Sequence, residues 1–218
     1  MISLRPGTLT LVALLGLGPV AALPPATLAS PTARHEGLNQ QEGMNMGGND
    51  PRKATTIQTT SAKLGGVADA VMVRYLNLPW GPQTFGYIEN GGNQFYSLRT
   101  WPIAHLTLKT RAKFFGRDFE PGDYVLTLVP KGLAPRMGMQ VRSFQPSGNG
   151  GTFLVPGNVF TETPNGPIVA SRPVEFKPGA PQSDAMRISL TSKKNMVEMT
   201  INYGDRSFTE TLTMVKVK

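Results

Sequence analysis

Apolar and polar residues alternate along most of the chain beyond about residue 55. In residues 104–109, Ala104, Leu106 and Leu108 would lie on one face of a strand, with polar residues on the other. A period of two is typical of a half-buried β-strand, and no segment carries a sustained helical stripe. The pattern therefore predicts an all-β protein. Comparable runs occupy residues 70–76, 94–99, 123–130, 137–144, 186–190, 197–203 and 208–217.

Glycine and proline separate these runs. The chain contains 24 Gly and 19 Pro, many of them paired where a run ends. Such pairs favour tight turns. Short turns at residues 191–195 and 204–207 would join the last three runs, and the stretch 146–181 would hold two irregular strands, at 152–155 and 173–176. We therefore expect an antiparallel β-sandwich or open barrel of about eight to ten strands.

The N-terminus has the layout of a secretory signal peptide. Arg5 is the only charged residue before Arg34, and residues 8–18 form an apolar run that Pro19 ends. A basic start, a short apolar run and a small-residue exit are typical of a cleaved leader. A membrane anchor is the alternative, but the run is shorter than the ~20 residues that a span needs. We expect a signal peptide over residues 1–29 and a periplasmic, cell-envelope or secreted protein.

Residues 30–54 show no apolar periodicity and are rich in Gly, Asn, Gln and Glu. Such a segment cannot bury enough apolar surface to offset the entropy of ordering it. It is expected to be a flexible linker, so that the chain has a disordered N-terminal tail before a β-sandwich domain at residues 55–218.

One strand carries a more specific pattern. Gly122, Tyr124, Leu126 and Pro130 follow one another at the spacing Pro-Gly-x-Tyr-x-Leu, with a proline that stops the strand. This resembles a bacterial family of secreted β-sandwich domains of unknown function. The resemblance implies a β-sandwich and a signal peptide, and it implies no activity.

The resemblance would extend over residues 68–216. Tyr75 and Pro79 are similar to the family's earlier strand and turn, and Tyr203 to its last aromatic–glycine step. The chain departs from the family in its Trp-Arg-x-Gly-Ala-Asn segment, near which only residues 98–101 stand here.

The composition excludes several kinds of chemistry. Without cysteine there are no disulfides, thiolate zinc sites or cysteine nucleophiles, and two histidines cannot supply a three-histidine metal site. Neither Gly-x-Ser-x-Gly nor His-Glu-x-x-His occurs, and no serine or acid adjoins His105 to pair with it. A hydrolase is therefore disfavoured.

The ten methionines include two Met-x-Met pairs. Thioethers select Cu(I) and imidazole accepts copper in both oxidation states. A copper ion could be held by a set of residues from the tail and the domain, and could support redox chemistry such as superoxide removal. The alternative is that the second pair, Met137 and Met139, fills the core. The candidate metal ligands are His35, Met44, Met46 and His105.

The formal net charge is +8, and the segment from Arg99 to Arg117 contains no acid. Lys109, Arg111 and Lys113 would share one face if the strand continued through them. Such a face would bind an anionic polymer or an acidic face of an envelope or surface-layer protein, although a charged solvated edge is the alternative. Outside the cytoplasm nucleic acid is not an expected partner, and membrane contact is expected only through partners.

Six aromatic residues lie between residues 80 and 101, interleaved with Gly, Asn and Gln. Exposed aromatic faces beside amide side chains are typical of saccharide-binding sandwiches, while a buried cluster explains the same residues and is the preferred interpretation. The favoured function is a binding or accessory subunit of the envelope. The alternative is a copper-binding extracytoplasmic protein.

Overall fold

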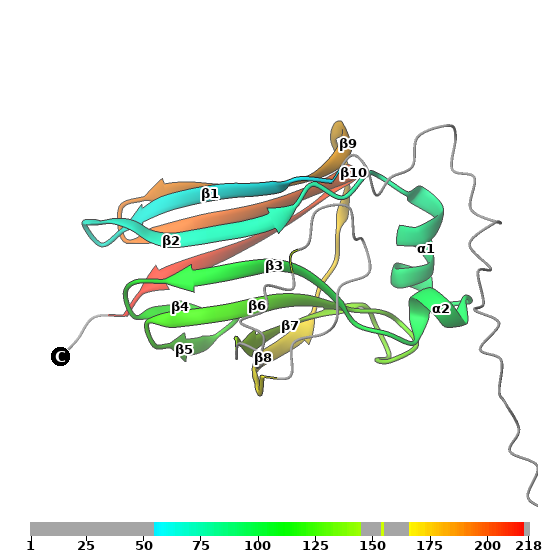
Figure 1. The fold of residues 1–218 in the computed structure, drawn as a ribbon, viewed down its shortest axis with the longest axis horizontal. Helices are drawn as coiled ribbons and strands as arrows, with labels where there is room; N and C mark the ends of the chain where they lie inside the picture. The colour runs from blue at the N-terminus through cyan, green and yellow to red at the C-terminus, as the bar shows by residue number, and fades with distance from the viewer. Residues whose placement is uncertain (1–54, 145–153, 155–165, 216–218) are drawn as a thin grey trace, which may run out of the picture. The chain divides into compact units, whose positions relative to one another are not determined.

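The computed structural model describes residues 55–144, 154 and 166–215 (Figure 1). The predicted signal peptide, the predicted linker and most of the irregular strand expected at residues 152–155 lie outside these residues. All described residues belong to one compact unit.

Ten strands in the described residues form two antiparallel sheets, which confirms the predicted β-sandwich. The six-stranded sheet has the order β1–β2–β3–β6–β7–β8, and the four-stranded sheet has the order β5–β4–β10–β9. The strands are β1 (Ile57–Leu64), β2 (Val67–Leu76), β3 (Trp101–Leu108), β4 (Ala112–Phe114), β5 (Arg117–Phe119), β6 (Gly122–Val129), β7 (Gly138–Ser143), β8 (Ile168–Pro173), β9 (Lys177–Lys193) and β10 (Met196–Met214).

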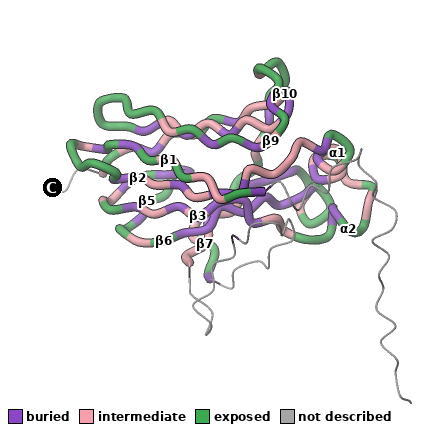
Figure 2. Tube along the Cα trace, turned by 45° about the horizontal axis from the view of Figure 1, so that its top comes forward, coloured by how far each residue is buried: buried purple, intermediate pink, exposed green. Residues whose placement is uncertain are grey.

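The alternation seen in the sequence sets which face of each strand is buried. In the six-stranded sheet Leu106 pairs with Val73 on one side and with Tyr124 on the other, so their side chains share the inner face. Met199 and Ile201 of β10 face them from the second sheet, within the same core. Figure 2 shows long buried stretches along β3, β6 and β7.

Met137 and Met139 also belong to this core, at 4% and 0% exposure. Each therefore packs as an apolar side chain, as the core interpretation of this Met-x-Met pair expects.

Two short helices lie at one end of the sandwich (Figure 1). Helix α1 (Pro82–Asn90) begins with proline in its first turn and ends before Gly91, whose φ is 81°. It buries Phe85 and Ile88, which are three residues apart on one face. Helix α2 (Gln94–Ser97) follows directly.

Three expectations about individual elements were wrong. Residues 94–99 are not a strand, because the Asn93 side chain accepts hydrogen bonds from the backbone of Phe95 and Tyr96 and starts α2. Residues 173–176 are not a strand, because β8 ends at Pro173 and β9 begins at Lys177. β3 ends at Leu108, so Lys109, Arg111 and Lys113 do not share one strand.

Within the described residues, no helix has both the length and the apolar composition needed to cross a membrane.

Candidate functional site

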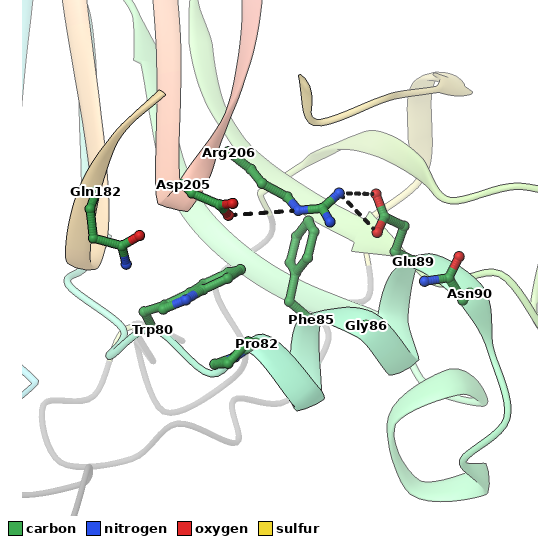
Figure 3. Close-up of a pocket in the computed structure, with 9 residues that line it drawn as sticks. All are labelled: Trp80, Pro82, Phe85, Gly86, Glu89, Asn90, Gln182, Asp205 and Arg206. Atoms are coloured by element: carbon green, nitrogen blue, oxygen red, sulfur yellow. Dashed lines mark hydrogen bonds and ion pairs between the residues drawn. The ribbon is translucent and has the colours of Figure 1, made fainter. Parts of the chain in front are cut away.

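A pocket lies where α1 meets the predicted turn at residues 204–207 and the neighbouring part of β9 (Figure 3). The chain reverses at this turn, since the Met214 amide donates to the Asn195 carbonyl at 3.0 Å and the Thr200 and Thr209 hydroxyls lie 3.2 Å apart. The volume of the pocket is about 300 Å³, at the lower end of the range for small-molecule sites. Trp80, Pro82 and Phe85 contribute from the start of α1 and the segment before it. The other side chains that line it are polar: Glu89, Asn90, Gln182, Asp205 and Arg206.

The segment before α1 holds Trp80 in place. The Trp80 amide donates to the carbonyl of Asp184 at 2.8 Å, and the Met186 amide donates to the carbonyl of Leu78 at 2.7 Å. Residues 78–80 thus pair with residues 184–186 of β9, although they belong to the connection between β2 and α1. These bonds hold the backbone at Trp80 against β9.

The Trp80 ring packs against two consecutive residues of β10. Tyr203 meets it edge to face at 4.7 Å between ring centroids. Gly204 has φ +65°, and a Cβ atom there would lie 2.2 Å from Cε2 of the indole. Only glycine allows the strand to pass this close to the ring.

Tyr203 is locked from its other end as well. Its hydroxyl donates to the Pro79 carbonyl at 2.8 Å. Burial raises the pKa of Tyr203 to about 12, so the hydroxyl is protonated at every physiological pH. Tyr203 therefore serves as a permanent hydrogen-bond donor that ties β10 to the segment carrying Trp80.

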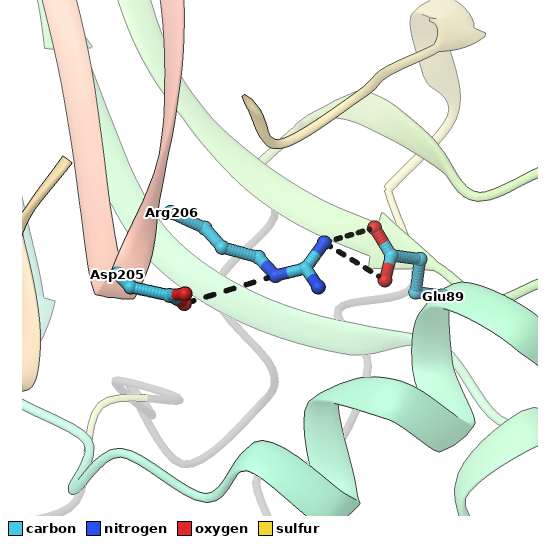
Figure 4. Close-up of polar contacts among 3 residues, drawn as sticks. All are labelled: Glu89, Asp205 and Arg206. Carbon is cyan, nitrogen blue, oxygen red and sulfur yellow. Dashed lines mark hydrogen bonds and ion pairs between the residues drawn. The ribbon is translucent and has the colours of Figure 1, made fainter. Parts of the chain in front are cut away.

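An ion pair forms the polar wall of the pocket (Figure 4). Nη1 of Arg206 donates to both carboxylate oxygens of Glu89, at 2.9 and 3.1 Å, and Nε lies 3.9 Å from Oδ1 of Asp205. The Arg206 guanidinium also lies 5.7 Å from the ring centroid of Phe85. With 32% and 22% of the Arg206 and Glu89 side chains exposed, this pair is shielded from water on most sides and joins β10 to α1.

The charges of the pocket differ from those of the whole chain. Glu89 and Asp205 bring two carboxylates against the single guanidinium of Arg206, and Asn90 and Gln182 add uncharged amides. The pocket is thus weakly acidic on a protein whose net charge is +8. Amides and paired carboxylates offer both donors and acceptors to a ligand, in front of an aromatic floor.

The five basic residues predicted as a binding surface come from separate elements, and their role in binding stays a prediction. Arg99 follows α2, while Lys109, Arg111, Lys113 and Arg117 lie around β4 and β5. Arg111 is paired with Glu120 at 2.8 Å. Lys113 and Arg117 are exposed on neighbouring strands, with Lys113 opposite Asp118 in the register. Asp118 and Glu120, which follow the basic run in the sequence, thus lie beside Lys113 and Arg111.

His105 is the one predicted metal ligand within the described residues. Its Nε2 lies 3.1 Å from Oδ1 of Asp123, which also accepts a hydrogen bond from Thr107, and its ring packs against Phe144. Burial lowers the pKa of His105, against the opposing effect of Asp123.

His35, Met44 and Met46 lie outside the described residues, so the copper hypothesis stays a prediction. In the part of the chain that the structure describes, no three His, Asp or Glu side chains gather closely enough to hold a metal ion.

Sequence reasoning indicated only half of the pocket. Trp80 and Phe85 stood out in the aromatic segment, and the structure places them against a wall that comes from elsewhere. Glu89 and Arg206 are 117 residues apart, and nothing in the local pattern of either predicts their pairing. The one available signal was the pair Tyr203–Gly204, which interrupts the alternation of the last strands.

Comparisons of the chain with models of protein families, with curated proteins and with solved structures found no match. The resemblance to a secreted bacterial family therefore stays a prediction.

Proposed function

We propose that this chain is an extracytoplasmic binding module of the cell envelope, and that the pocket beside Trp80 binds a neutral saccharide unit of an envelope polymer. The observation that carries the proposal is the combination of a fixed indole with amide and carboxylate side chains around one small pocket. The leader and spacer predicted from the sequence support the location.

The chemistry of the pocket selects among ligand classes. A sugar ring offers an apolar C–H face, which packs on an aromatic ring, and hydroxyl groups, which both donate and accept. Two carboxylates against one guanidinium leave a net negative charge in the pocket, which disfavours an anion. A neutral, hydroxyl-rich ligand satisfies both requirements. The small volume of the pocket limits the bound part of the ligand to about one ring.

The proposal is tested by calorimetric titration of the purified chain with neutral oligosaccharides of glucose, mannose and N-acetylglucosamine. Binding of one of these is expected. The exposed lining residues Gln182 and Asp205 are then each changed to Ala, because neither forms part of the core. Each change removes a hydrogen-bonding partner and should weaken binding by roughly tenfold.

Gln94→Ala is the matched control, since Gln94 is exposed on α2 and does not line the pocket. Its affinity should equal that of the parent chain. The proposal fails if none of the oligosaccharides binds, or if the Gln182 and Asp205 variants bind as tightly as the control.

A further inference from the structure

Three large apolar side chains are exposed at the end of the sandwich that carries the helices. Phe95 is 41% exposed, Leu98 56% and Leu133 47%. Phe95 and Leu98 belong to α2 and its C-terminal cap, and Leu133 lies in the connection between β6 and β7. We refer to these three residues, with Arg99, Lys131 and Arg136, as the α2 tip.

Backbone contacts bring the two segments of the α2 tip together. The Lys131 amide donates to the carbonyl of Ile88 at 2.9 Å. A Cβ atom on Gly132 would lie 2.8 Å from the carbonyl oxygen of Ser97, so the two segments are in contact there. Leu133 and Leu98 each follow directly after one of these touching residues. The exposed apolar side chains therefore belong to one surface.

The support beneath this surface is rigid. Tyr96 stacks with both Tyr87 and Trp101, with ring centroids 5.8 Å apart in each pair. The Trp101 indole also donates to the Tyr96 carbonyl at 3.0 Å. Phe95 therefore projects from a helix that is anchored by its neighbouring residue, and it does so without the entropy cost that ordering a loose loop would add.

The charge around the α2 tip has one sign. Arg99 lies 4.3 Å from the ring centroid of Phe95, and Lys131 and Arg136 are exposed in the other segment. Both segments lack acids altogether, since no Asp or Glu occurs in residues 90–117 or 124–144. The surface thus combines exposed apolar side chains with basic ones.

We propose that the α2 tip binds an anionic lipid bilayer, with Phe95, Leu98 and Leu133 in the headgroup region and the basic residues against lipid phosphates. A few apolar side chains and a ring of cations suffice for such peripheral binding. A stable protein interface takes about 20–30 residues on each side, which is far more than this surface offers. The proposal does not depend on the saccharide pocket, and it makes membrane contact direct, whereas the sequence suggested contact only through partners.

The test is co-sedimentation with vesicles of phosphatidylcholine alone or with one quarter phosphatidylglycerol. Every variant is made in the full chain and purified from the same cell fraction, so that all carry the same N-terminus. The parent chain should sediment with the anionic vesicles and be released by high salt. Changing Leu98 and Leu133 to Ser, or Arg99, Lys131 and Arg136 to Gln, should weaken binding by about tenfold or more.

Val67→Ser with Met196→Ser is the matched control. These residues are 43% and 40% exposed, and they stand at the β1–β2 and β9–β10 turns, away from the helices (Figure 1). Unchanged vesicle binding by this control supports the proposal, provided all variants keep the parent's melting temperature. Failure of the parent chain to bind anionic vesicles overturns it, and so does an equal loss in the control or equal binding to both kinds of vesicle.

Discussion

At residue 204 the backbone does two things that a side chain would prevent. Gly204 adopts φ +65°, which costs an L-residue roughly 1–2 kcal/mol, and it lets β10 touch the face of Trp80. The closeness of strand and indole is what leaves the ring fixed at the edge of the pocket. Gly204 thus shapes the pocket although it does not line it.

Gly204→Ala should lower the free energy of unfolding by roughly 2–5 kcal/mol, because backbone strain and displacement of the indole add. Gly116→Ala is its control, since Gly116 has a similar φ of +73° but no atom within 4 Å of the added Cβ. It should cost only the strain. Denaturant unfolding of both variants measures the difference, and equal losses would contradict the account of Trp80.

His105 shows how burial and a charged neighbour oppose each other. The pKa of its ring is lowered by burial, with a smaller effect of the same sign from Arg74, while Asp123 pulls it upward. A histidine with a lowered pKa resists protonation in the folded state. The stability that depends on neutral His105 is therefore present above the ordinary value of 6.5 and is lost as pH falls from there through the folded pKa.

An NMR titration should give a pKa below 6.5 for His105, and Asp123→Asn should lower the pKa further because it removes the favourable charge. The amide oxygen of Asn can still accept from Thr107, so the local structure is kept. His35 is the only other histidine, and a His35→Ala chain assigns the signal. A pKa at or above 6.5, or a pKa that does not change in the Asp123→Asn variant, would contradict this account.

At the scale of elements, strands were predictable and the helices were not. The runs around Leu106 and Ile201 alternate, and each of them is a strand. α2 contains Phe95 and Tyr96, which favour strands by propensity, and only the capping bonds of Asn93 decide for a helical turn. α1 is nine residues long, too short for its apolar stripe to stand out.

The last strands illustrate a second limit. The chain reverses at Gly204 and Asp205, as their composition predicts, since the Met214 amide donates to the Asn195 carbonyl at 3.0 Å and the Thr200 and Thr209 hydroxyls lie 3.2 Å apart. Residues 177–183 pair with the chain beside this turn, and they lie in a Gly- and Pro-rich stretch that carries no alternation of its own. Local sequence therefore predicted the turn but not the strand that pairs beside it.

The candidate site was less predictable than the fold for the same reason. Its aromatic floor is contiguous in sequence, but its polar wall joins α1 to β10 through Glu89 and Arg206. Pairing between such distant residues follows from the order of the strands. The sequence predicted a β-sandwich or open barrel but not that order. The placement of the basic run was unpredictable for the same reason, because β3 ends before Lys109 and Glu120 pairs with Arg111. Its role in binding stays a prediction.

At the scale of the whole molecule, the two proposed surfaces lie at the same end. Glu89 of the pocket and Ile88, which contacts the α2 tip, are neighbours in α1. A module that binds a lipid surface through the tip would hold the pocket close to that surface. Saccharides joined to envelope lipids or lying on a membrane would then be the ligands within its reach.

This account requires that the chain leave the cytoplasm. We expect mass spectrometry of the protein from the envelope or culture medium to find a new N-terminus at Leu23 or Ser30, after Ala22 or Ala29, since small residues precede leader cleavage. An intact Met1 in the cytosolic fraction would contradict the predicted location.

The most direct test of the proposed function uses the chain's own fluorescence. Trp80 and Trp101 are the only tryptophans, so Trp101→Phe leaves the pocket indole as the sole reporter. In this variant, neutral oligosaccharides should change Trp80 emission saturably, and adding Asp205→Ala should shift the midpoint to a roughly tenfold higher concentration. Emission that stays constant across every oligosaccharide, with the protein folded, would show that the pocket is not a saccharide site.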